Sequence, residues 1–212
     1  MSNLMIEIYN QQYGCLENRW LIKEPLPEDI SHYIAGQPLA NGLCIELEPQ
    51  EPVPAFLQAY LLDQDFSRII IRAELPIDRL SYQNHNGREL SLMLSGIKPL
   101  SFFFDEKTFL LGEAYPFHYF QPYVESGEII FRQLEDESFI SPGCMMLLYA
   151  LPAEVWRFDA FIDHVKQLHQ QGWNLELERR EGELLGYTPS QMEEYLTYLQ
   201  QVKGDLATPG GR

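Results

Sequence analysis

The amino-acid sequence predicts a single α+β domain, in which a mixed β-sheet is covered by helices and a helical hairpin lies at the C-terminal end. Short segments with strand periodicity and segments with helical periodicity follow one another irregularly along the chain. The 212 residues suffice for a substantial core, and 45% hydrophobic with 22% charged residues is typical of a globular domain. We therefore expect one domain over residues 1–204 and a flexible tail over residues 205–212.

The first third of the chain alternates strands with short helices. Apolar and polar residues alternate over residues 4–9, as in a half-buried strand, and the run Ile69-Ile70-Ile71 is typical of a sheet interior. A strand, helix and strand in succession favour a parallel crossover. We expect strands over residues 4–9, 20–22, 43–48 and 68–74, and helices over residues 28–35 and 52–62.

The stretch over residues 84–106 combines apolar and ionisable side chains most densely. Asn86 can cap a short helix over residues 87–95, and Gly96 stands where a left-handed C-terminal cap is expected. A wholly apolar segment, residues 100–104, then predicts a buried strand. This helix and strand form one predicted packing unit.

The C-terminal half shows the longest helical pattern, which Gly172 ends. Residues 178–195 fit helix-turn-helix spacing, but Glu193 and Glu194 occupy the exposed positions where a DNA reader needs cations. We therefore interpret this segment as a helical hairpin packed on the sheet. We expect strands over residues 109–113, 128–134, 145–151 and 173–177, and helices over residues 116–126, 153–171 and from Pro189 onward.

The chain is strongly acidic. Its 15 Lys and Arg against 31 Asp and Glu give a net charge of −16 and a pI near 4.6. Such a field repels phosphate backbones and anionic membranes, so nucleic-acid and membrane binding are disfavoured. It suits solubility, a basic protein partner or mimicry of nucleic acid.

The cysteines indicate a reducing compartment. Cys15, Cys44 and Cys144 are widely spaced and form no Cys-x-x-Cys pair, so we expect free thiols. The N-terminus lacks the pattern of a signal peptide, and no apolar run is long enough to span a bilayer. We expect a soluble, cytoplasmic protein, whose oligomeric state the sequence does not give.

The sequence contains no motif for catalysis, for a metal or for a cofactor. Glycine-rich phosphate loops, the Gly-x-Ser-x-Gly elbow and paired Cys-x-x-Cys motifs are all missing. His164 and His169 are five residues apart, whereas zinc ligands on one helix stand three or four apart, so we interpret them as part of a polar helix face. We assign no catalytic residue, no metal and no cofactor.

One region nevertheless qualifies as a candidate binding site. Binding groups often collect where a strand end meets a helix start. The opposing interpretation is that the helix start is solvated, Lys98 extends its amine to water, and the acids end the strand at the surface. The candidate site residues are His85, Arg88, Glu89, Lys98, Asp105 and His118.

Our leading hypothesis is a binding protein that acts on a protein partner, of basic charge, as an inhibitor or immunity-type factor. The net charge and the many Tyr and Phe residues, which interfaces favour, motivate it. The alternative is an enzyme or small-molecule binder with an anion-binding pocket around Arg88, Lys98 and His118. Mimicry of nucleic acid is a third hypothesis, which requires the carboxylates to line one face.

Overall fold

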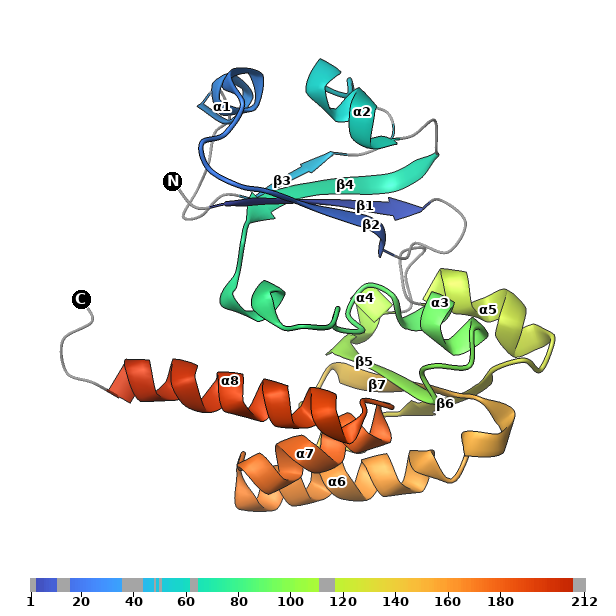
Figure 1. Cartoon of the computed structure of the whole chain (residues 1–212). Helices are drawn as coiled ribbons and strands as arrows, with labels where there is room; N and C mark the ends of the chain where they lie inside the picture. Colours follow the sequence, from blue (N-terminus) through green and yellow to red (C-terminus); the bar gives the residue numbers. More distant parts are fainter. Residues whose placement is uncertain are drawn as a thin grey trace. The chain divides into compact units, whose positions relative to one another are not determined.

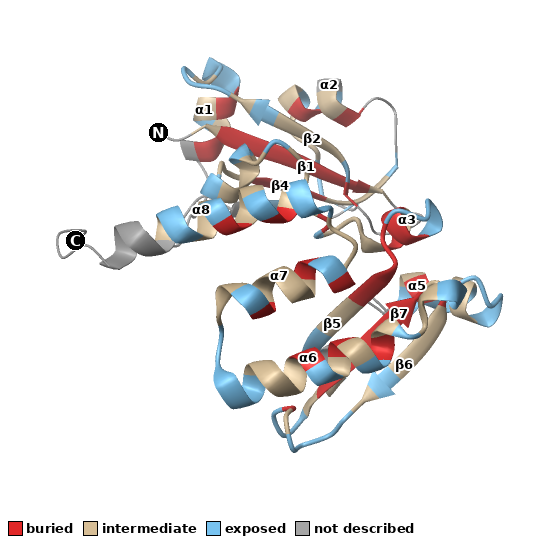
Figure 2. Ribbon diagram, turned by 60° about the horizontal axis from the view of Figure 1, so that its bottom comes forward, coloured by how far each residue is buried: buried red, intermediate tan, exposed pale blue. Residues whose placement is uncertain are grey.

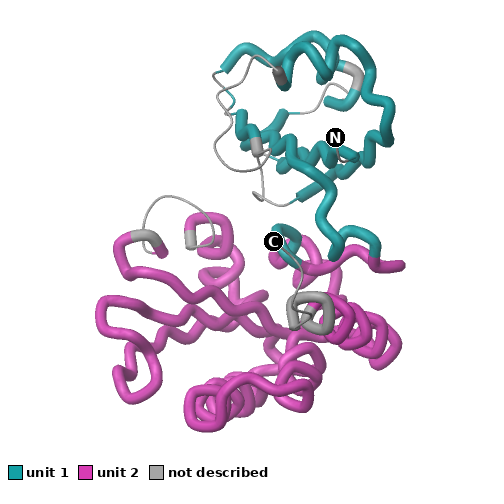
Figure 3. The backbone as a smooth tube through the Cα atoms, turned by 90° about the vertical axis from the view of Figure 1, so that its left-hand side faces the viewer, with its two compact units in different colours: residues 1–79, 86–88 teal, residues 80–85, 89–212 magenta. Residues whose placement is uncertain are grey.

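The computed structural model describes residues 3–10, 16–35, 44–47, 49, 51–61, 65–110 and 117–207. The chain divides into two compact units, shown in different colours in Figure 3. Unit 1 consists of residues 1–79 and 86–88, and unit 2 of residues 80–85 and 89–212. The α+β class and the C-terminal helical hairpin are confirmed.

Unit 1 is built on a four-stranded antiparallel sheet with the order β2-β1-β4-β3. The helices α1 and α2, with the short helix η1, cover one face of the sheet, and Ile30 of α1 and Leu57 of η1 contribute to the apolar core there (Figure 1). The central strand β1 is almost wholly buried. The elements are β1 (Leu4–Asn10), β2 (Leu16–Ile22), α1 (Glu28–Ala35), β3 (Cys44–Leu47), η1 (Ala55–Leu57), α2 (Gln58–Leu61), β4 (Phe66–Ala73) and η2 (Pro76–Arg79).

Unit 2 contains a three-stranded antiparallel sheet with the order β5-β7-β6. On the neighbouring strand positions 102 and 103, Phe102 packs on Phe161 of α6 and Phe103 packs on Phe120 of α5. Because neighbouring strand residues point to opposite faces, the sheet lies between these two helices. Figure 2 shows its central strand β7 as buried.

The last three helices of unit 2 pack one after another, since α7 contacts both α6 and α8. The elements are α3 (Glu89–Leu94), β5 (Leu100–Glu106), α4 (Lys107–Leu110), α5 (Phe117–Glu125), β6 (Ile130–Leu134), β7 (Cys144–Ala150), η3 (Pro152–Glu154), α6 (Arg157–Gln171), α7 (Leu175–Leu184) and α8 (Pro189–Ala207).

The sheet differs from the expected arrangement in two respects. The described strands form two sheets in place of one mixed sheet, and β3 pairs with β4 antiparallel, so the predicted parallel crossover is wrong. The crossover was inferred from element order alone, which does not give strand direction. The one-domain boundary at residue 204 stays a prediction, although α8 continues to Ala207 and residues 208–212 lie outside the described residues.

Two predicted strands are wrong. Residues 107–110 form the helix α4, and residues 111–113 of the predicted strand lie outside the described part of the chain. The predicted strand over residues 173–177 is the start of α7, because the Asn174 side chain accepts hydrogen bonds from the N–H groups of Glu176 and Leu177 (3.0 and 2.9 Å). This N-cap satisfies backbone donors of the first helical turn, and it outweighs the strand-like alternation.

No helix in the described residues is both long and apolar enough to cross a bilayer. Cys144 carries a free thiol, Cys15 lies outside the described residues, and only the backbone of Cys44 is described.

Candidate functional site

A buried polar cluster surrounds Tyr187 in unit 2. The Tyr187 ring stacks on the His85 ring at 3.9 Å between centroids, and its hydroxyl accepts a hydrogen bond from the His85 backbone N–H (2.9 Å). The Lys98 Nζ lies 5.8 Å from the centroid of the same ring. His85 and Lys98 are only 5% and 4% exposed. We call these three residues, with Glu89, Glu181 and His164, the Tyr187 cluster.

The turn between α7 and α8 places Tyr187. Gly186 has φ +91°, and a Cβ there would lie 2.2 Å from Pro99 Cδ, so this turn fits against the start of β5 only without a side chain. Thr188 then caps α8, since its hydroxyl accepts the Gln191 N–H (3.3 Å) and its own N–H donates to the Gln191 side chain (2.8 Å). Thr188 and Gln191 thus form a capping box at the start of α8.

Lys98 is a buried cation with carboxylates in range. Burial lowers the pKa of Lys98 to about 8, against the opposing charges of Glu89 and Glu181. Burial also raises the pKa of Tyr187, and both carboxylates add to this effect while the hydrogen bond from His85 opposes it. Desolvation therefore outweighs charge attraction at the amine, and the expectation that Lys98 reaches water is wrong.

His164 belongs to the same cluster through Glu181. Its Nε2 lies 3.0 Å from a Glu181 carboxylate oxygen, and the side chain is 1% exposed. Its Nδ1 is buried without a hydrogen-bond partner among the described residues. The interpretation of His164 as part of a solvated polar face is therefore wrong, because the α7 helix, predicted to begin as a strand, covers it.

The structure brings only part of the candidate set together. His85, Glu89 and Lys98 act on the same Tyr187 ring. Asp105 is exposed at the end of β5, and His118 is exposed on α5, where its ring contacts only the neighbouring Tyr119 ring in the contacts described. Arg88 belongs to unit 1. A pocket around Arg88, Lys98 and His118 stays a prediction.

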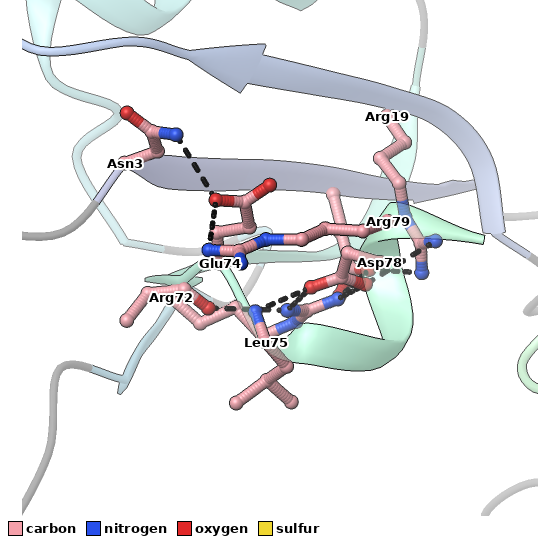
Figure 4. A network of polar contacts seen from close by, with 9 residues as sticks. Asn3, Arg19, Arg72, Glu74, Leu75, Asp78 and Arg79 are labelled. Atoms are coloured by element: carbon pink, nitrogen blue, oxygen red, sulfur yellow. Dashed lines mark hydrogen bonds and ion pairs between the residues drawn. The ribbon is translucent and has the colours of Figure 1, made fainter. Parts of the chain in front are cut away.

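Unit 1 carries a second buried polar group, formed by Glu7, Arg19, Arg72 and Asp78. Figure 4 labels three of these residues, Arg19, Arg72 and Asp78. Arg72 donates to both oxygens of Glu7 (3.1 and 2.8 Å) and to both oxygens of Asp78 (2.9 and 2.6 Å). Arg19 pairs with Glu7 and lies 3.6 Å from Asp78. We call these four residues the arginine–carboxylate network.

In this network the two carboxylates and the two guanidinium groups balance each other's charge. The Glu7 and Asp78 side chains are 5% and 3% exposed. Burial opposes the charged form of Asp78, but hydrogen bonds from Arg72 and the Leu75 N–H, with the charges of Arg72 and Arg19, lower its pKa below the ordinary value. The hydrogen bond to Asp78 raises the pKa of Arg72. Burial opposes this rise, and the hydrogen bond to Glu7 adds to it. Within this network, each arginine is therefore bound by carboxylates and is not available for a ligand.

Exposed carboxylates gather at one end of the unit 2 sheet. In the register, Glu106 of β5 pairs with Cys144 and Leu134 of β6 pairs with Met146, so both strands end beside the start of β7. Lys107, just after β5, forms a 2.5 Å ion pair with Glu135, just after β6. We call this surface the acidic edge. Its exposed acids are Asp105, Glu106, Glu135, Asp136 and Glu137.

Neither a surface hollow nor a metal-ligand group points to a further candidate site within the described residues. An open hollow in unit 1 is lined by Glu24, Pro25, Leu26 and Ser31, which include none of the candidate residues. Within the described residues, no three His, Cys, Asp or Glu side chains are arranged to hold a metal ion.

Sequence reasoning missed Tyr187, Glu181 and the arginine–carboxylate network. One signal was available for the turn: Gly186 and Tyr187 stand just before Thr188 and the predicted helix start at Pro189. For Glu7 the pattern misled, because an acid in an alternating strand indicates a solvent face, whereas β1 lies between two other strands and both its faces are covered.

Comparison with known proteins gives little further information. No protein-family model and no curated protein matches the chain. A solved structure described as the crystal structure of the bacterial cysteine methyltransferase effector NleE is similar, with 14% identity and a TM-score of 0.40. The alignment covers 61% of this chain and 66% of that chain, which is less than two thirds of its length.

Proposed function

We propose that this protein binds a basic protein partner through the acidic edge and acts as an inhibitor or immunity-type factor. The observation that supports the proposal most is the convergence of exposed carboxylates from two strand ends on one end of a single sheet. Complementary charge speeds association and selects partners of opposite sign. A partner surface rich in lysine or arginine would complement the acidic edge.

An exposed aromatic side chain adjoins these acids. Phe104 is 47% exposed and lies two positions before Glu106 on β5, so both side chains point to the same face of the strand. Protein interfaces combine aromatic anchors with a polar rim. Phe104 therefore supplies the apolar contact that charge alone does not give.

The local cations do not neutralise this surface. Lys107 pairs with Glu135, and Lys166 lies 5.2 Å from the Phe139 ring centroid, where its charge acts on Asp136. In the same unit Arg132 is held by Asp159 (2.5 Å) and Arg179 by Glu193 (2.7 Å). The acids of the edge thus outnumber the cations near them.

We place this activity in the cytoplasm, because the free thiol of Cys144 suits a reducing compartment. We do not propose mimicry of nucleic acid. Within unit 2, exposed acids also lie on α6 and α7, such as Asp163 and Glu176, and mimicry requires them on one face.

A capture experiment tests the proposal with two variants of equal charge. In the edge variant Asp105, Glu106, Asp136 and Glu137 become the corresponding amides, and in the control variant the exposed helix acids Glu125, Asp163, Glu176 and Glu183 do. Each full-length chain serves as bait in a native lysate at low salt. We expect the wild type and the control variant to retain the same protein and the edge variant to lose most of it.

Two outcomes would contradict the proposal. If the wild type retains no protein that raised salt releases, there is no charge-dependent partner. If the control and edge variants lose the partner equally, overall charge matters and the acidic edge does not.

A further inference from the structure

Lys98 lies beneath the turn that joins α7 to α8. Its side chain is only 4% exposed, and Tyr187 of the turn lies over its amine. Gly186 of the same turn packs against Pro99, the residue that follows Lys98. Tyr187 also holds His85 by stacking and by its hydroxyl. The lysine is thus covered by a segment attached through a few identifiable contacts.

The groups that act on this amine come from several elements. Glu89 of α3 and Glu181 of α7 attract its charge. Glu181 is in turn bound to His164 of α6. Other titratable groups around the turn include His85, Tyr82, whose ring lies 6.0 Å from that of Tyr187, and Glu194 of α8, which accepts hydrogen bonds from Ser81. Arg157 of α6 donates to the carbonyls of Glu183 and Leu184 at the end of α7 (3.0 and 3.2 Å).

We propose that Lys98 makes the attachment of the α7–α8 turn depend on protonation, so that proton uptake at Nζ loosens Tyr187 from its site and proton release tightens it. The proposal concerns the interior of unit 2 and does not rest on the acidic edge. It assigns a regulatory role to a buried amine that the proposed binding through the acidic edge does not use.

The direction of the pH dependence follows from the balance between burial of the Lys98 amine and its attraction to the two carboxylates. Burial lowers the pKa of Lys98 to about 8 although two carboxylates oppose it, so the closed turn disfavours the charged amine. When the turn opens, the amine regains the ordinary lysine pKa of about 10.4. Between these two values the closed form binds fewer protons than the open form, so closure becomes more favourable as pH rises.

The first test compares unfolding of three proteins in urea between pH 7.5 and 9.5. All carry Trp20→Phe, so that the remaining tryptophans, Trp156 and Trp173, both report on unit 2. The reference protein carries Trp20→Phe alone. Between pH 7.5 and pH 9.5, we expect its unfolding equilibrium constant to fall by on the order of tenfold more than that of the protein with Lys98→Met. Lys166→Met, which removes a lysine over an aromatic ring at a less buried position, should follow the reference.

A second test needs no folded lysine variant. Competitive labelling of the wild-type amines, read by mass spectrometry, should show Lys98 reacting more slowly than Lys166, with a midpoint near pH 8. Tyr187→Ala should accelerate labelling of Lys98 by at least about tenfold and leave Lys166 unchanged.

The proposal is overturned if Lys98→Met shows the same pH dependence of unfolding as the reference protein. It is equally overturned if Lys98 in the wild type labels at the rate and with the midpoint of Lys166, because the amine would then be open to solvent at every pH. If Lys98→Met does not fold, the labelling result alone decides.

Discussion

Arg72 holds two carboxylates from different elements with one guanidinium. Glu7 lies on the central strand β1, and Asp78 lies in η2, which follows β4. Both carboxylates are nearly inaccessible to water, so Arg72 and Arg19 together balance their two negative charges. A buried pair of this kind is stable only while both partners are present, since removing one leaves an uncompensated charge.

Replacing Arg72 by Met should therefore destabilise unit 1 by about 3 kcal/mol, as expected for an orphaned buried charge. Arg132→Met is the matched control, because the Asp159 partner of Arg132 is 79% exposed. It should cost less than about 1 kcal/mol. Urea unfolding of both variants measures the difference, and equal losses would show that Glu7 and Asp78 reach solvent when the arginine is removed.

Asp78 makes the stability of unit 1 sensitive to acid. Its pKa is lowered in the folded protein, so the stabilisation is fully present above the ordinary aspartate value of about 3.9 and is lost as pH falls below it. Asp78→Asn should be less stable than wild type at pH 7, and the difference should shrink towards pH 2. Urea unfolding across this range measures it, with the exposed Asp163→Asn as control. A difference that stays constant with pH would contradict the assigned cause.

At the scale of the elements, the α7–α8 turn depends on Gly186. Alanine there combines a positive φ with contact to Pro99 Cδ and to the Ile97 carbonyl, whereas Gly96 has φ +75° with open space around it. Gly186→Ala should cost about 3 kcal/mol, from backbone strain and overpacking together. Gly96→Ala should cost about 1 kcal/mol, from strain alone. Thermal or urea unfolding compares the two, and equal costs would mean that the turn can move away from Pro99.

Local patterns predicted the elements better than their assembly. The strand over residues 4–9, the helix over residues 28–35 and the helix ends at Gly96 and Gly172 follow from alternation, periodicity and positive φ, which are properties of neighbouring residues. The division into two antiparallel sheets depends on pairing between distant segments. No local pattern carries that information.

The candidate site was harder to predict for the same reason. In one of the two interpretations of the site Lys98 reaches water, yet Tyr187, 89 positions later in the sequence, covers it. The alternation over residues 4–9 indicated a half-buried strand, but Glu7 is buried there and its partner Arg72 comes from a strand 65 positions away. In contrast, Asp105 and Glu106 are exposed as predicted, because a run of acids after an apolar strand marks its end by composition alone.

For the whole molecule, the effect of the net charge of −16 on binding depends on which acids are exposed and where they lie. Buried carboxylates such as Glu7 and Asp78 are paired within unit 1, and the proposed binding does not use them. The exposed acids include the group at the acidic edge, where Phe104 offers an apolar contact. Raised salt should weaken binding at this edge, because it screens exposed charges far more than buried pairs.

Carbodiimide crosslinking of the bait to its captured partner tests the binding account most directly, because this reagent joins carboxylates to lysine amines in contact. We predict that the crosslinks map by mass spectrometry to Asp105, Glu106, Asp136 and Glu137, and that the control variant gives the same pattern. Crosslinks that map mainly to the exposed acids of α1, α6 and α7 would contradict the account.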